Sequence, residues 1–207
     1  MEMFSREWYN EYFKRAESSE THAQFCERVY GKDLCQHGLM HMRELDLLVS
    51  LIKPGSKILE IGCSNGYITE YIHDQTGATI LGLDFSDVAI EQARRRTADK
   101  SDSLQFEYVD LTQEEIPGSE YDYIILVDSI YFLGDFADSL FKFSEWLNDT
   151  GKMIVSVFQV KDEEDPEEIL LPDGTLLAQA LDQLRLAYTW YDFTVDVRAH
   201  GIENYRV

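Results

Sequence analysis

The chain has 207 residues, which is the size of one globular domain with at most an accessory segment. Hydrophobic residues make up 44% and charged residues 28%, so the sequence can bury a core and is neither disordered nor fibrous. The formal net charge of −21 disfavours nucleic acid and anionic lipid as partners, because both attract Lys and Arg.

The sequence has no apolar run of about 18 residues and no apolar signal-peptide segment near its N-terminus. It therefore predicts a cytoplasmic protein without a membrane partner, and leaves open whether the protein is a monomer or a homodimer. Cys26, Cys35 and Cys63 are an odd number without a Cys-x-x-Cys spacing. They predict neither a disulfide framework nor a metal site.

Residues 5–52 predict helices, because apolar residues recur at three- and four-residue steps. The clearest stripe includes Met42, Leu45 and Leu48, and Gly31 is predicted to end the preceding helix. Pro54-Gly55 then breaks the helical pattern.

From residue 57 onward, short apolar segments alternate with helical patterns. Strands are predicted at 57–61, 79–84, 104–110, 121–128 and 152–160, and helices near 66–75, 86–98 and 135–148, the last including Leu147. A further helix is predicted up to Tyr188, before a β-like run from Trp190. Apolar strands separated by helices favour a doubly wound α/β fold with a mostly parallel sheet.

The loop Gly62-Cys63-Ser64-Asn65-Gly66 lies between the first predicted strand and a helix. Its glycines permit a ligand to approach the backbone, and the helix N-terminus offers unpaired N–H groups to an anion. Asp84 ends the next strand, where an acid can accept hydrogen bonds from both hydroxyls of a ribose. Together these features predict a ligand that contains a nucleoside.

These segments resemble the class I S-adenosylmethionine-dependent methyltransferases. Glu60–Gly66 resembles their first motif, Gly82–Ser86 the second, Val109–Leu111 the third, and Tyr121–Asp128 the fourth strand and its exit. The resemblance runs from about residue 36 to 160 with the four motifs in order. It departs at Ser64, where the family has its middle glycine, so the loop either holds Ser64 at negative φ or stores local strain.

The resemblance implies a Rossmann-like methyltransferase sheet that binds S-adenosyl-L-methionine at residues 54–207, with an N-terminal helical cover, or substrate lid, at residues 1–53. It implies no metal. The implied cofactor-binding residues are Glu60, Gly62, Cys63, Asn65, Gly66, Asp84, Phe85, Ser86, Asp110, Leu111, Val127 and Asp128.

The expected acceptor is a small molecule that takes the methyl group on nitrogen or oxygen. Asp128–Tyr131 stands where amino-methylating nucleic-acid and glutamine enzymes have Asn/Asp-Pro-Pro-Tyr/Phe, and the net charge also argues against nucleic acid. His37 lies where related enzymes reach over the methionine end, as a base, a carboxylate contact or merely a surface or capping histidine. Trp8, Tyr9, Tyr12 and Phe13 either line a substrate pocket or pack on the sheet.

Two charged segments have simple interpretations. Arg94-Arg95-Arg96 is interpreted as a solvated helix face. The acidic run from Asp162 to Glu168 is interpreted as a solvated loop, or alternatively as an acidic lid that favours amine substrates.

Two other functions compete with methyl transfer. One is a non-catalytic module that binds S-adenosylmethionine or S-adenosylhomocysteine. The other is an α/β-hydrolase, because the same loop matches Gly-x-Ser-x-Gly with Ser64 as nucleophile, followed by Asp128 and His200. The hydrolase would need an upstream glycine-rich oxyanion segment, which the sequence lacks, and it leaves Glu60 and Asp84 without a role.

Overall fold

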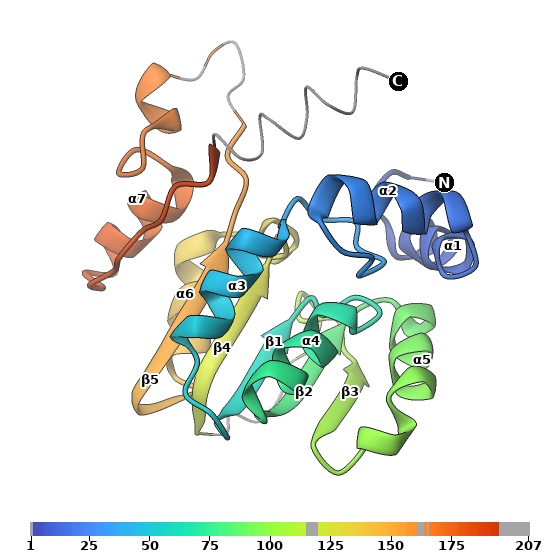
Figure 1. Cartoon of the computed structure of the whole chain (residues 1–207). Helices are drawn as coiled ribbons and strands as arrows, with labels where there is room; N and C mark the ends of the chain where they lie inside the picture. The colour runs from blue at the N-terminus through green and yellow to red at the C-terminus, as the bar shows by residue number, and fades with distance from the viewer. Residues whose placement is uncertain (1, 115–119, 161–163, 165, 195–207) are drawn as a thin grey trace.

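The computed structural model describes residues 2–114, 120–160, 164 and 166–194. In this part of the chain five parallel strands form one sheet in the order β3-β2-β1-β4-β5 (Figure 1). The strands are β1 (Lys57–Ile61), β2 (Thr79–Asp84), β3 (Leu104–Tyr108), β4 (Tyr121–Val127) and β5 (Leu147–Ser156). The predicted doubly wound α/β fold is confirmed.

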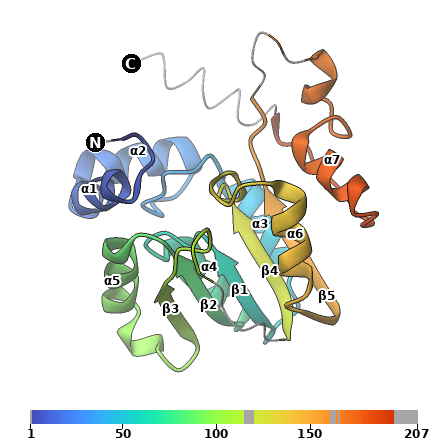
Figure 2. The ribbon, with the colours of Figure 1, turned by 180° about the vertical axis from the view of Figure 1, so that it is seen from behind.

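The α-helices are α1 (Arg6–Ala16), α2 (Glu20–Tyr30), α3 (Met42–Leu51), α4 (Tyr67–Thr76), α5 (Asp87–Arg96), α6 (Phe136–Ser144) and α7 (Leu176–Gln183). The 3-10 helices are η1 (Ala98–Lys100), η2 (Ile130–Phe132) and η3 (Glu167–Leu170). Helices α3, α4 and α5 cover one face of the sheet, and α6 with α7 covers the other (Figures 1 and 2).

Successive strand residues point to opposite faces of the sheet and join two separate cores. Ile58 and Ile80 belong to the core beneath α3, α4 and α5, whereas Leu59 and Leu83 belong to the core beneath α6. Because both faces are covered, the strands are apolar along almost their whole length. The α3 residue Leu45 lies in the same core as Ile58.

Helices α1 and α2 lie beyond the C-terminal ends of the strands, on the side of α5 (Figures 1 and 2). Ser5 caps α1 by accepting the Trp8 N–H, and Gly31 ends α2 at a φ of 89°, as the sequence predicts. Helix α1 is tied to α5 because Asn10 and Arg6 both donate to Asp87, at 2.8 Å and 3.0 Å. This attachment determines which face of α1 lies over the sheet edge.

Several predicted boundaries on the C-terminal side were wrong. Strand β5 ends at Ser156 rather than residue 160, and α7 ends at Gln183 rather than near residue 188. Leu147 does not extend α6 but begins β5, where it pairs with Tyr121 through an irregular register. The predicted β-like run is not a strand at residues 190–193, and Trp190 is 55% exposed there. The rest of that run lies outside the described residues.

Within the described ranges, no helix has the length and apolar character needed to cross a bilayer. The same residues contain no group of three or more His, Cys, Asp or Glu side chains arranged to hold a metal ion. Cys26, Cys35 and Cys63 are free and buried. Burial raises the pKa of the Cys63 thiol well above its usual value, so it stays protonated at neutral pH.

Candidate functional site

A cavity of about 760 Å³ lies at the C-terminal ends of β1, β2 and β4 and extends to the segment after β3. Helix α1 and residues 36–40 form its outer wall. Its volume is typical of a small-molecule site. In open α/β sheets ligands bind at this edge, where strand order reverses, and here β1 has β2 on one side and β4 on the other.

The loop after β1 has a left-handed backbone at alternate positions. The φ angles are 77° at Gly62, 53° at Ser64 and 75° at Gly66. Of the two expectations for Ser64, the strained one is therefore realised. The Ser64 N–H donates to Asp84 Oδ2 at 2.8 Å, and this charge-assisted hydrogen bond holds the residue in place.

The two loop glycines serve different purposes. Gly62 lines the cavity, and a Cβ there would overlap the Cβ of Ser129. Gly66 does not line the cavity; a Cβ there would lie 2.6 Å from Phe106 and 2.9 Å from Ala93. Gly66 therefore lets the start of α4 approach β3 and α5, and it is not placed to contact a ligand directly.

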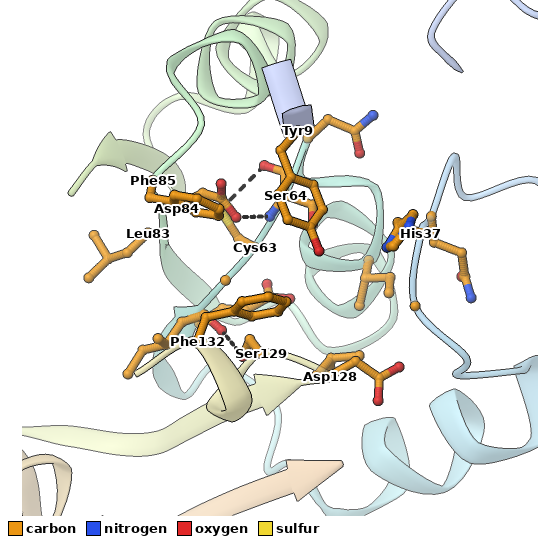
Figure 3. Close-up of a pocket in the computed structure, with 18 of the residues that line it drawn as sticks. Tyr9, His37, Cys63, Ser64, Leu83, Asp84, Phe85, Asp128, Ser129 and Phe132 are labelled. Atoms are coloured by element: carbon orange, nitrogen blue, oxygen red, sulfur yellow. Dashed lines mark hydrogen bonds between the residues drawn. The ribbon is translucent and has the colours of Figure 1, made fainter. Parts of the chain in front are cut away.

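Asp84 links the loop to the next strand. Only 6% of the residue is exposed, and its carboxylate accepts the Ser64 N–H (Figure 3). The carboxylate also accepts the Ser86 N–H at 2.8 Å. Burial raises its pKa to about 6 in spite of these hydrogen bonds. Ser86 itself lies away from the cavity, because its hydroxyl accepts the Ala89 N–H at the start of α5 and donates to Asn10 at 2.6 Å.

Glu60 and Asn65 have unsatisfied polar atoms inside the cavity wall. Each residue is 2% exposed, and neither Glu60 Oε2 nor Asn65 Nδ2 has a hydrogen-bond partner among the described residues. Burial, aided by the nearby Asp84, raises the pKa of Glu60 to about 7. The Thr69 hydroxyl lies beside the Glu60 carboxyl and the Cys35 thiol beside Asn65. Both Glu60 and Asn65 line the cavity, where a ligand can offer each of them a hydrogen bond.

The raised pKa of Glu60 predicts a pH-dependent stability. An ordinary Glu titrates near 4.5, so between that pH and about 7 the folded protein holds more protons than the unfolded chain. The stabilisation is complete below pH 4.5 and is lost as pH rises through about 7. Between pH 5 and pH 8 the Glu60 side chain should lower the unfolding free energy by on the order of 3 kcal/mol. Urea unfolding of Glu60→Gln over the same pH range should lack most of this decline. An identical decline in variant and wild type would contradict this assignment.

The remaining candidates lie along the same edge. Cys63, Phe85, Leu111 and Val127 line the cavity. Asp110 also lines it, and its carboxylate accepts from the Thr112 hydroxyl and N–H within the turn after β3.

Asp128 connects the N-terminal segment to the end of β4. It has a φ of 48°, and its carboxylate accepts the Leu39 N–H at 2.6 Å and the Tyr131 hydroxyl at 3.3 Å. Burial raises the pKa of this carboxyl above its ordinary value. Residues 36–40 are thereby attached to the sheet at the cavity mouth.

His37 lies in the outer wall among aromatic rings. Its ring meets those of Tyr12, Trp8 and Tyr9 edge-on, with centroids 4.9, 5.3 and 5.5 Å away. These neighbours desolvate the imidazole and lower its pKa, although its outer side is exposed. His37 is thus mostly neutral at pH 7.

Sequence reasoning missed some residues of this site. Tyr131, Phe132 and Phe158 line the cavity, although only their position just after β4 and β5 could have indicated it. Of the four N-terminal aromatic residues, Tyr9 and Phe13 line the cavity, whereas Trp8 and Tyr12 do not.

Arg96 is not a solvated side chain as predicted. Its guanidinium lies 3.6 Å from the centre of the Tyr67 ring and donates to the Asn65 carbonyl at 2.8 Å. Arg96 therefore braces the loop after β1 from behind. Of the acidic run, residues 162, 163 and 165 lie outside the described residues, as does His200.

The chain is similar in sequence to known methyltransferases. Residues 59–153 match the model of a methyltransferase domain family. The chain is 30% identical to phosphoethanolamine N-methyltransferase 1 of Arabidopsis thaliana over 131 residues, which are 63% of this chain and 26% of that protein. It is also 30% identical to the bovine eEF1A lysine and N-terminal methyltransferase over 96 residues, 46% of this chain and 13% of that protein.

A solved structure extends the likeness in fold to nearly the whole chain. It is phosphoethanolamine N-methyltransferase 2 of Haemonchus contortus in complex with phosphomonomethylethanolamine and S-adenosylhomocysteine. The TM-score is 0.59 at 15% identity, over 98% of this chain and 44% of that one. The chain thus spans about a quarter of the Arabidopsis relative and under half of the Haemonchus chain.

Proposed function

Since the chain carries a class I S-adenosylmethionine-dependent methyltransferase domain, we propose that it transfers a methyl group from S-adenosyl-L-methionine to a nitrogen or oxygen atom of a small molecule. The observation that carries this proposal is the convergence of Glu60, Gly62 and Asp84 on one cavity at the switch point of the sheet. The relatives' names include both small-molecule and protein methyltransferases. The proposal of a small-molecule acceptor is therefore based on the cavity rather than on the relatives.

The residues present fit the cofactor. Glu60 Oε2 near the end of β1 and Asn65 Nδ2 in the loop that follows are an acceptor and a donor without a hydrogen bond to a described residue, which suits the ammonium and carboxylate of a methionine moiety. Asp84 keeps free lone pairs for ribose hydroxyls beside its two backbone hydrogen bonds. Gly62 leaves the space that a Cβ would occupy.

S-adenosylmethionine, when bound, supplies a methyl group whose bond to sulfur breaks with its electron pair left on sulfur, while the acceptor's lone pair forms the new bond. The chain's own residues position the two reactants and exclude water. We assign Asp110 and Leu111 to the adenine end, Asp84 to the ribose, and the segment around His37 to the methionine end and the acceptor. On this proposal residues 1–53 act as a lid over the domain at 54–207, attached through Asp128.

Isothermal titration tests the cofactor, and release of S-adenosylhomocysteine with a panel of small amines and alcohols tests the reaction. We expect micromolar binding of S-adenosylhomocysteine and turnover of at least one acceptor. A serine-directed fluorophosphonate should leave Ser64 unlabelled.

The same measurements separate the competing functions. Binding without turnover of any acceptor would favour a non-catalytic module. Labelling of Ser64 together with absence of cofactor binding would favour the hydrolase and contradict our proposal.

A further inference from the structure

The cavity has two chemically different ends. Its adenine end lies by β3, and its opposite end lies by β4, three strand spacings or about 14 Å away in the sheet. Asp128 lies at the β4 end, and the cavity lining also includes rings from three separate segments, those of Tyr9, Phe132 and Phe158. The Tyr9 and Phe132 rings contact each other and Phe85 after β2, so they extend from the middle of the cavity toward Asp128. On the proposed function, the β4 end is where the acceptor meets the methyl group.

Tyr9 presents an unused hydroxyl to this end. The residue is 8% exposed, and its hydroxyl makes no hydrogen bond with any described residue. Figure 3 shows it pointing into the cavity, toward the side bordered by His37, Asp128 and Phe132. A hydroxyl that opens onto the cavity without a partner among the described residues is placed to bind a polar group of a ligand.

Charge narrows the class of that ligand. Four carboxyl groups line the cavity, those of Glu60, Asp84, Asp110 and Asp128. Aromatic faces and a carboxylate together attract an organic cation, and they disfavour an anion, because like charges at a binding site cost several kcal/mol.

The one Arg or Lys side chain among the described lining residues, that of Arg6, is already paired with a carboxylate outside this group. Its guanidinium donates to Asp87 from both Nε and Nη2, and it lies over the Tyr108 ring of β3. Its charge is therefore already paired with Asp87 on α5 and directed toward β3.

We propose that the acceptor is an amine on an uncharged, largely apolar skeleton without a phosphate group, bound at the β4 end by the Tyr9 hydroxyl, the Asp128 carboxylate and the ring of Phe132. This inference rests on the proposed function and specifies its substrate. It separates this chain from the relatives named for phosphoethanolamine, whose substrate carries a phosphate dianion.

The test measures acceptor binding to the full chain saturated with S-adenosylhomocysteine, so that it does not depend on turnover. Two matched pairs serve as probes: ethanolamine against phosphoethanolamine isolates the phosphate, and 2-phenylethylamine against 2-phenylethanol isolates the amine. Each amine without phosphate should bind at least about tenfold more tightly than its partner. Tyr9→Phe, which keeps the ring, should weaken 2-phenylethylamine about three- to tenfold.

A variant with an added cation tests whether the excess of carboxyl groups is what disfavours a phosphate. Phe158 is 44% exposed and lines the cavity, so Phe158→Arg supplies the missing cation and should improve phosphoethanolamine relative to ethanolamine by at least about fivefold. Phe141 is 57% exposed on α6 and does not line the cavity. Phe141→Arg, with the same change in net charge, should leave that ratio unchanged.

The outcomes distinguish the inference from the function beneath it. Failure of S-adenosylhomocysteine to bind, measured first, would overturn the proposed function. With S-adenosylhomocysteine bound, tighter binding of phosphoethanolamine than of ethanolamine, or equal binding of 2-phenylethylamine and 2-phenylethanol, would overturn the inference alone. Absence of 2-phenylethylamine binding at millimolar concentrations would also overturn it.

Discussion

Gly62→Val is expected to lower S-adenosylmethionine affinity by at least about 100-fold, equivalent to about 3 kcal/mol. The added side chain would overlap Ser129 and occupy the cavity where the cofactor must pass the backbone. The φ of 77° at this position adds strain that a β-branched residue tolerates poorly. Isothermal titration measures the affinity, and urea unfolding measures how much of the loss reflects the fold.

Gly55 provides a matched control for this variant. Its φ is 75°, nearly that of Gly62, but nothing lies within 4 Å of a Cβ built there. Gly55→Val should therefore carry a similar backbone cost without loss of affinity. Adding Ser129→Gly to a Gly62→Ala variant should recover part of the binding. Normal affinity in Gly62→Val would show that the cofactor does not pass this point.

Asp84→Asn should lower cofactor affinity with little net change in stability. Loss of a charged acceptor for the ribose hydroxyls should weaken binding by about 1.5–3 kcal/mol, roughly 10- to 150-fold. The carboxylate also accepts the N–H groups of Ser64 and Ser86, and an amide can accept at only one oxygen, which costs about 1–3 kcal/mol. Burial of the charge raises the pKa of Asp84 to about 6, so the neutral amide also removes a comparable cost of burying the carboxylate above that pH. Because the two effects oppose each other, the unfolding free energy at pH 8 should change little.

Titration of the cofactor and urea unfolding report affinity and stability separately. Asp102→Asn, the same change at an exposed position, is the control and should alter neither quantity. An affinity within about twofold of wild type in Asp84→Asn would remove this residue from the ribose role. A fall of more than about 3 kcal/mol in the unfolding free energy would show that the two backbone hydrogen bonds outweigh the cost of burying the charge.

The Glu60, Asp84 and Asp128 positions could be predicted because their signals are local. Glu60 and Asp84 lie at or near the ends of short apolar strands, and Asp128 directly follows one. The C-terminal ends of parallel strands meet at one edge, so chain order alone brings these residues together. The loop that opens with Gly62 is likewise recognisable from its glycines and the helix behind it. The fold class followed from the change of hydrophobic period near residue 57.

The orientation of side chains around that edge depended on contacts between distant segments. The Ser86 hydroxyl faces away from the cavity because it donates to Asn10 of α1. Gly66 lies outside the cavity lining because it packs against Phe106 of β3. Helical period groups Tyr9 with its neighbours but does not say which face of α1 meets the sheet edge; the bonds from α1 to Asp87 do. The sequence by itself therefore determined the sheet, the loop and the row of acids, since these depend on residues adjacent in the chain. Only the tertiary structure decided which side chains face the cavity, because that depends on how helices far apart in sequence pack together.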